Sequence, residues 1–150
     1  NEANNISSAM CVRYLLNNAY VCEGDILLHN PKIIQKYQYQ SNYCGIKVDR
    51  TDDWCLFENK GRITGYAVGG ENCHQMMGIS YWTEEDGKKL GDCIKKVYEM
   101  PGGKERYWDQ VALGYYVEDF DIAIRECSFD DFIEIDTFNE LKAIDKIYDV

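Results

Sequence analysis

The sequence predicts an α/β domain with a mixed sheet. A helical pattern at residues 6–17 precedes an apolar, strand-like run at residues 19–23, and a second helical pattern extends from Thr83 to about Met100. Between these patterns, four runs of β-forming residues are separated by turn residues. The helix-then-strand order at the start indicates parallel pairing, whereas the consecutive strands in the middle indicate antiparallel pairing.

Capping and turn residues predict where the elements begin and end. Pro31 opens a predicted short helix at residues 31–38, because the first helical N–H has no partner that proline would remove. Asn59-Lys60-Gly61 predicts an antiparallel hairpin, and Thr137 with Glu140 forms a capping-box pattern before a last helix. The other predictions are strands at residues 43–49, 54–58, 62–68, 74–82, 121–126 and 131–135, and a helix at about residues 107–116.

The composition limits the classes of function. A chain of 150 residues suits one domain with a real core. Its net charge of −10 argues against binding the backbone of a nucleic acid, and no apolar run is long enough to span a membrane, so neither partner is expected. Seven cysteines without a C-x-x-C pair indicate neither a zinc site nor a complete disulfide framework. We therefore expect a reduced, cytoplasmic setting.

Two acidic pairs follow apolar strand candidates. Glu23 and Asp25 stand in CEGDIL, and Glu134 and Asp136 stand in FIEIDTF. Residues two apart on an extended strand point to the same side, so carboxylates from both segments could meet at one Mg²⁺, which prefers oxygen ligands. The alternative is structural, with Asp25 as a turn residue and Asp136 as a neighbour of the helix cap.

Aromatic residues stand beside acids in three further segments. Aromatic faces with nearby carboxylates can hold a quaternary ammonium group, which donates no hydrogen bonds and is attracted by cation–π interactions and charge. Packing in the core is the alternative for each ring. The three segments are TDDWCLF around Trp54, GISYWTEED around Tyr81 and Trp82, and ERYWDQV around Tyr107, Trp108 and Asp109.

Taken in order, these segments resemble the bacterial CTP:phosphocholine cytidylyltransferases of the nucleotidyltransferase superfamily, in their C-terminal portion. NNISSAMCVRYLLNNAYVCEGDILL is similar to a helix and metal-bearing strand of that family, and DDWCLFENKGRITGYAV to its aromatic hairpin. MMGISYW, YWDQV and FIEIDTFNEL are similar to a later strand, a substrate-binding helix and a second metal-bearing strand. The resemblance implies an incomplete, Rossmann-like three-layer nucleotidyltransferase fold with a mixed sheet and an antiparallel hairpin insertion.

The resemblance also implies a Mg²⁺-dependent reaction. The phosphate oxygen of phosphocholine would attack the α-phosphorus of CTP, giving CDP-choline and pyrophosphate. Alternatives are a non-catalytic phosphocholine-binding module, or a nucleotidyltransferase acting on phosphoethanolamine or a sugar 1-phosphate. The implied catalytic and metal-binding residues are Asp25 and Asp136, and the implied choline-binding residues are Trp54, Tyr107, Asp109 and Glu134.

The sequence departs from the family in one respect. The family begins with a strand and a Gly-rich loop that carries a basic residue and holds the nucleotide phosphates, and these 150 residues contain no such loop. We therefore expect residues 1–150 to form a single, N-terminally truncated domain. An exposed sheet edge would then favour a homo-oligomer or a domain-exchanged dimer.

Overall fold

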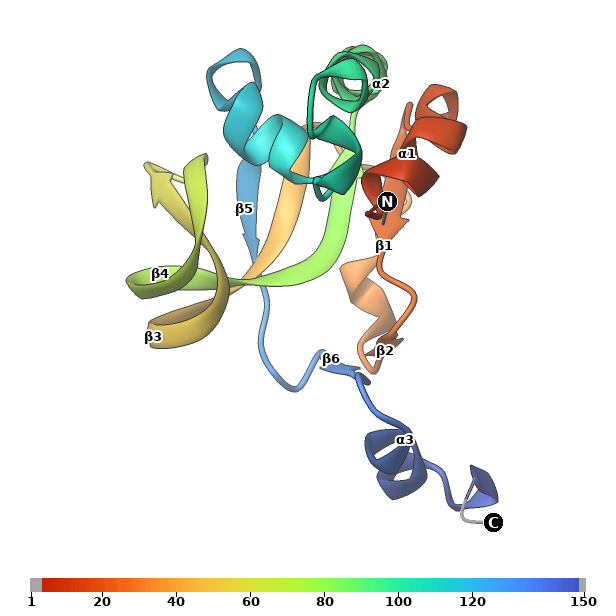
Figure 1. Cartoon of the computed structure of the whole chain (residues 1–150). Helices are drawn as coiled ribbons and strands as arrows, with labels where there is room; N and C mark the ends of the chain where they lie inside the picture. The colour runs from red at the N-terminus through yellow and green to blue at the C-terminus, as the bar shows by residue number, and fades with distance from the viewer. Residues whose placement is uncertain (1–3, 149–150) are drawn as a thin grey trace.

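The computed structural model describes residues 4–148, and a four-stranded mixed sheet lies at its centre (Figure 1). The strand order is β1-β4-β3-β5. Strands β1 and β3 both run antiparallel to β4, whereas β3 and β5 run parallel. The bounds of the strands are Ala19–Cys22 (β1), Asn42–Asn59 (β3), Arg62–Trp82 (β4) and Ala123–Glu126 (β5).

The prediction that the first strand pairs parallel with its neighbour is wrong. Strand β1 pairs antiparallel with the end of β4, with Ala19 opposite Trp82 and Cys22 opposite Ile79. The direction of β1 relative to its neighbour is set by β4, which has already reversed direction at the hairpin. The parallel pair is β3 with β5, two strands joined by β4 and the helices that follow it.

The four predicted middle strands are two long, bent strands. They meet at the predicted hairpin, where Lys60 (φ 54°) and Gly61 (φ 81°) take the positive φ values of a type I′ turn. Strand β4 bends near Gly69, whose φ is 76°. At this bend a Cβ on Gly70 would lie 2.7 Å from Cys55 Sγ, so the two strands approach closely.

Helices cover one face of the main sheet. Helices α1 (Ile6–Val12) and α2 (Glu84–Glu99) lie above it in Figure 1, and Thr83 begins α2 by accepting from the Asp86 N–H at 3.2 Å. The short elements η1 (Arg13–Leu15), η3 (Gly103–Glu105), η4 (Val111–Tyr115) and η5 (Val117–Asp119) complete this layer. The larger core lies between the helices and the sheet, and its buried side chains include Ile6, Tyr43, Leu56, Trp82, Leu90, Ile94, Val97 and Phe120.

The opposite face carries a small second sheet. Strands β2 (Ile26–Leu28) and β6 (Phe132–Glu134) pair antiparallel and, with η2 (Pro31–Ile33), cover a second core. The arrangement therefore has three layers, as predicted.

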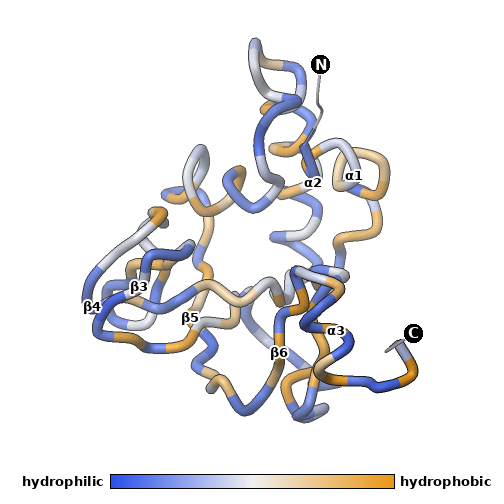
Figure 2. Tube along the Cα trace, turned by 60° about the horizontal axis from the view of Figure 1, so that its bottom comes forward, coloured by the Kyte–Doolittle hydropathy of each residue, from blue (hydrophilic) through white to orange (hydrophobic). Residues whose placement is uncertain are grey.

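Apolar residues occur in short stretches along the whole chain rather than in one long run (Figure 2). The buried side chains of this second core are Ile33, Cys44, Ile46, Met77, Ile79 and Phe132.

The C-terminal helix lies apart from the main sheet. Helix α3 (Phe138–Ile144) follows β6 and is succeeded by η6 (Lys146–Tyr148), at the lower end of Figure 1. The predicted capping box is confirmed, since Thr137 Oγ1 accepts from the Glu140 N–H and the Glu140 carboxylate accepts from the Thr137 N–H at 2.7 Å.

Two predicted helices have a different form. The helix at 31–38 is limited to Pro31–Ile33, because the Gln35 N–H donates to the Tyr20 hydroxyl at 3.0 Å instead of continuing the helix. The helix at 107–116 is a π-helix, Val111–Tyr115, in which the Tyr116 N–H donates to the Val111 carbonyl at 2.9 Å. Such wide turns often occur at functional sites.

Two further sequence expectations concern the environment of the chain. All seven cysteines are free thiols in the described structure, and four of them are buried. Within residues 4–148, no helix is both long and apolar enough to cross a bilayer.

Close packing of α2 on η1 generates a stability prediction. A Cβ at Gly87 would overlap the Leu16 carbonyl, which is backbone and cannot rotate away. Gly87→Ala should therefore lower the free energy of unfolding by about 2–3 kcal/mol, measured by urea denaturation. Gly65→Ala is the matched control, since nothing lies within 4 Å of a Cβ there. Equal stability of the two variants would contradict this packing.

Candidate active site

Pairing of β2 with β6 brings the two predicted acidic segments together. Ile26 lies opposite Glu134, and the Ile135 N–H donates to the Asp25 carbonyl at 2.8 Å. The start of β2 thus meets the end of β6, because the two strands are antiparallel. Residues more than a hundred positions apart in the sequence therefore contribute carboxylates to one place.

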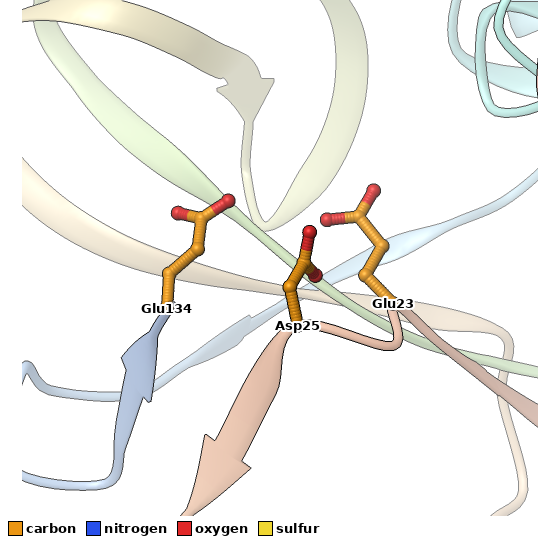
Figure 3. A group of neighbouring side chains, drawn as sticks. All are labelled: Glu23, Asp25 and Glu134. Atoms are coloured by element: carbon orange, nitrogen blue, oxygen red, sulfur yellow. The ribbon is translucent and has the colours of Figure 1, made fainter. Parts of the chain in front are cut away.

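Three carboxylates form the tightest group at this position. One oxygen from each of Glu23, Asp25 and Glu134 lies within 4.8 Å of the others. Figure 3 shows the three side chains projecting to the same side, with Asp25 between the other two. Carboxylate oxygens are the donors that Mg²⁺ prefers, so the chemistry of these residues fits such an ion.

The predicted partner of Asp25 has a more peripheral place. Asp136 lines the same cavity as Asp25, but it is not one of the three grouped carboxylates. Its backbone N–H donates to Glu140 Oε2 at 2.9 Å, which ties the residue to the start of α3. Glu134, which the resemblance assigned to choline, is one of the three grouped carboxylates.

Glu23 occupies space left by a glycine. A Cβ on Gly78 would overlap the Glu23 carboxylate, and the Glu23 N–H donates to the Gly78 carbonyl at 2.8 Å. Burial, together with the nearby charges of Asp109 and Asp25, raises the pKa of Glu23 to about 7. Burial, with the nearby charge of Asp136, also raises the pKa of Glu134. The sequence placed Glu23 in an acidic pair with Asp25, but it could not show that Gly78 leaves the space for this side chain.

The carboxylates line one cavity of about 780 Å³. All six residues singled out by the resemblance border this cavity. Among the described residues that line it, none is Lys or Arg, so the cavity attracts cations. The acidic residues lining it are Glu23, Asp25, Asp53, Asp109, Glu134 and Asp136.

Aromatic rings form another part of the wall. Trp54 and Tyr107, both singled out by the resemblance, have ring centroids 5.3 Å apart with the planes at 65°. Tyr66 stacks on Trp54 at 5.3 Å with an interplanar angle of 21°. Tyr66 was not a predicted site residue, because its position opposite Leu56 depends on the exact register of the hairpin.

Two other predicted aromatic candidates belong to the core. Trp82 is completely buried and packs edge-to-face against Trp108 at 6.1 Å and Phe120 at 5.9 Å. Tyr81 is also buried and contacts Tyr20 at 5.1 Å. The structural alternative is therefore correct for this segment.

Asp109 is a buried acid next to the aromatic wall. It is 4% exposed, and its Oδ1 accepts from the Gln110 N–H at 2.9 Å. The buried Tyr43 hydroxyl makes a long contact of 3.5 Å to Oδ2. Burial raises the pKa of Asp109 to about 6 despite these hydrogen bonds, and burial with the charge of Asp109 raises the pKa of Tyr43.

The fold is similar to that of solved nucleotidyltransferases. The structure of CTP:phosphocholine cytidylyltransferase from Streptococcus pneumoniae matches 97% of the chain with a TM-score of 0.82 and 22% sequence identity. The chain covers 64% of that protein. No protein-family model matches the sequence.

Sequence relatives are cytidylyltransferases, which confirms the predicted resemblance. The chain is 29% identical over 151 residues to 2-aminoethylphosphonate cytidylyltransferase from Lancefieldella rimae, a match of 98% of the chain and 61% of that protein. It is 23% identical over 142 residues to choline-phosphate cytidylyltransferase from Haemophilus influenzae, a match of 93% of the chain and 60% of that protein. The chain therefore spans less than two thirds of the length of either relative.

Burial of Asp109 generates a pH prediction. Its folded pKa of about 6 exceeds the value of about 3.9 for an unfolded chain, so its contribution to stability is greatest below about pH 4 and is lost as the pH rises to about 6. Asp109→Asn keeps the hydrogen-bonding shape without the charge. At about pH 8 it should raise the free energy of unfolding by up to about 3 kcal/mol, and at about pH 4 by almost nothing.

Urea denaturation at several pH values measures this difference. The exposed Asp92→Asn is the control and should shift stability by less than about 0.5 kcal/mol throughout. A stabilisation by Asp109→Asn that stays constant with pH would rule out the buried charge as its cause.

Proposed function

We propose that the protein transfers CMP from CTP to phosphocholine, with release of pyrophosphate. A phosphate oxygen of phosphocholine forms a bond to the α-phosphorus of CTP while the bond from that phosphorus to the pyrophosphate oxygen breaks. The observation that carries the proposal is the cavity, which places the Trp54 and Tyr107 rings next to a row of carboxylates. The cytidylyltransferase relatives support the class of reaction.

The aromatic wall suits the cationic end of the acceptor. A quaternary ammonium group cannot donate hydrogen bonds, so it binds through ring faces and negative charge. Trp54 and Tyr107 supply the rings, and the buried Asp109 supplies charge without free access to water. Burial of this carboxylate strengthens its attraction for a cation.

The acidic group suits the phosphate end through a metal ion. Asp25, Glu23 and Glu134 would hold Mg²⁺, with Asp136 beside them. Mg²⁺ bound there would neutralise phosphate oxygens that the acidic cavity otherwise repels, and would stabilise the charge that develops on the leaving pyrophosphate. The protein itself then acts by positioning the acceptor phosphate in line with the bond that breaks.

A second acceptor is favoured by the relative that acts on 2-aminoethylphosphonate. The primary ammonium group of 2-aminoethylphosphonate donates hydrogen bonds, so carboxylates alone could hold it. The ring pair in this cavity favours phosphocholine, because a primary ammonium gains less from ring faces once it is bound to carboxylates. Turnover of phosphocholine, phosphoethanolamine and 2-aminoethylphosphonate by the full-length gene product would rank the three.

The metal site generates an activity prediction. Asp25→Asn and Asp136→Asn should each lower Mg²⁺-dependent pyrophosphate release by about a hundredfold or more, because each removes a charge that faces the metal and phosphates. A coupled pyrophosphate assay with the full-length protein measures the rate, and Mn²⁺ binding followed by electron paramagnetic resonance measures the site independently. Near-wild-type rates in either variant would contradict its assignment.

An exposed acid on α2 supplies the matched control. Glu85→Gln makes the same change of charge at a residue that is not among those lining the cavity, and it should leave both Mn²⁺ binding and turnover unchanged. Loss of activity in this variant would show that overall charge, rather than the carboxylate group, governs the rate.

The aromatic wall generates a prediction on substrate affinity. Trp54→Ala should raise KM for phosphocholine by about 2–30-fold, which corresponds to a lost cation–π contact of about 0.5–2 kcal/mol. The KM for CTP should change little. A sugar 1-phosphate acceptor would be indicated instead if Trp54→Ala left KM for phosphocholine unchanged, while calorimetric binding of phosphocholine without any response to CTP and Mg²⁺ would indicate a binding module.

A further inference from the structure

Gln110 makes three hydrogen bonds around the aromatic wall. It directly precedes the π-helix η4, and its backbone N–H donates to Asp109 Oδ1 at 2.9 Å. Its side-chain Oε1 accepts from the Tyr107 N–H at 2.9 Å, and its Nε2 donates to the Tyr66 hydroxyl oxygen at 2.9 Å. Gln110 thus contacts Tyr107 and Asp109, which lie close to it in the sequence, and also Tyr66, which belongs to the hairpin.

The orientation of the amide is determined by its partners. The Tyr107 backbone N–H can only donate, so it requires the amide oxygen, and the amide nitrogen then faces the Tyr66 hydroxyl. Both bonds have ordinary length. The bond to the Tyr66 hydroxyl is partly buried, which limits competition from water there, whereas the bond from the Tyr107 N–H is exposed.

Tyr66 connects Gln110 to Trp54, because its hydroxyl is bound by Gln110 and its ring packs on Trp54. The Tyr66 ring stacks on Trp54 at 5.3 Å on one side. On another side it contacts Gly114, where a Cβ would lie 2.7 Å from Tyr66 Cε1. The ring is therefore confined between Trp54 and η4, with its hydroxyl fixed by Gln110.

We propose that Gln110 is a positioning residue that determines specificity for a cationic acceptor, a role that rests on the proposed function. It holds Tyr107 directly and Trp54 through Tyr66, and so maintains the centroid separation of 5.3 Å and the angle of 65° between the two rings that line the cavity. Cation–π attraction depends on the cation lying over the ring face, so loosening either ring weakens it. Gln110 itself is not among the described residues that line the cavity, so it acts through its neighbours.

Two substitutions at Gln110 separate its hydrogen bonds from its size. Gln110→Met keeps the length of the side chain but removes both side-chain hydrogen bonds. Gln110→Glu keeps them, because one carboxylate oxygen accepts from the Tyr107 N–H and the other can accept from the Tyr66 hydroxyl. Tyr66→Phe is a third variant that removes one of the two bonds and leaves the stacked ring in place.

A comparison of two acceptors provides the readout. Phosphocholine and 3,3-dimethylbutyl phosphate have the same shape, but the second carries carbon in place of the quaternary nitrogen. In the full-length protein, Gln110→Met should raise KM for phosphocholine about tenfold. It should leave kcat and the KM for CTP within about twofold of wild type, and change the KM for 3,3-dimethylbutyl phosphate less than about threefold. Tyr66→Phe should shift KM in the same direction by about threefold, and Gln110→Glu should stay within about threefold of wild type.

Several outcomes would overturn the role. An equal rise in KM for phosphocholine and for 3,3-dimethylbutyl phosphate would indicate a merely structural residue. Failure of Gln110→Glu to keep KM near the wild-type value would indicate the same. If Gln110→Met does not fold in a thermal melt, Tyr66→Phe decides: an unchanged ratio of the two KM values overturns the proposal.

Binding of choline separates this role from the proposed function. Calorimetry should show that the wild-type protein binds choline and that Gln110→Met binds it about tenfold more weakly. Equal binding by both proteins would overturn the positioning role and leave the proposed substrate in place. A wild-type protein that binds neither choline nor phosphocholine would overturn the proposed substrate and this role with it.

Discussion

The candidate site depends on the pairing of two three-residue strands. Strands β2 and β6 would be marginal as an isolated pair, because so short a ladder cannot offset the entropy of ordering it. Their apolar side chains, Leu28 and Phe132 among them, pack on the far face of the main sheet. At the other end of the pair, the His29 N–H donates to the Asp131 carbonyl at 2.8 Å. Burial of this small layer therefore fixes where Asp25 and Glu134 meet.

The carboxylates gathered there carry an electrostatic cost. Burial raises the pKa values of Glu23, Asp109 and Glu134, and repulsion from neighbouring carboxylates adds to the rise for Glu23 and Glu134. The folded chain therefore holds these negative charges less easily than the unfolded chain does. A concentration of charge that opposes folding is typical of a site built for a ligand of opposite charge. A divalent cation and the ammonium group of an acceptor would each relieve part of this repulsion.

Different layers of the fold supply the two sides of the cavity. The acidic group comes from the small second sheet, whereas Trp54 comes from the bent hairpin and Tyr107 from the segment before the π-helix. The distance between the proposed cationic and metal subsites is thus set by how these layers pack on the main sheet. Such an arrangement selects an acceptor by its length as well as by the charge at each end.

The sequence by itself determined the local elements, and tertiary structure decided the partners. The Lys60-Gly61 turn, the Thr83 cap and the Thr137 capping box were all predictable, because each rests on residues within four positions of one another. The resemblance further indicated that Trp54, Tyr107 and Asp25 belong to one site, and the cavity includes all three. Composition and spacing alone could not have shown this, since they left both acids and rings with structural alternatives.

The register of the hairpin explains why Tyr66 was not predicted to belong to the site. The hairpin turn pairs Asn59 with Arg62 and Glu58 with Ile63, but an irregularity next to Phe57 then moves the pairing by one residue, so that Leu56 lies opposite Tyr66. A shift of one residue reverses the face on which every later side chain lies, and here it places Tyr66 on the same face as Trp54. Likewise, the antiparallel direction of β1 and the space beside Gly78 for Glu23 depend on strands distant in the sequence. Local pattern contains no information on such contacts, because they exist only once the layers have packed.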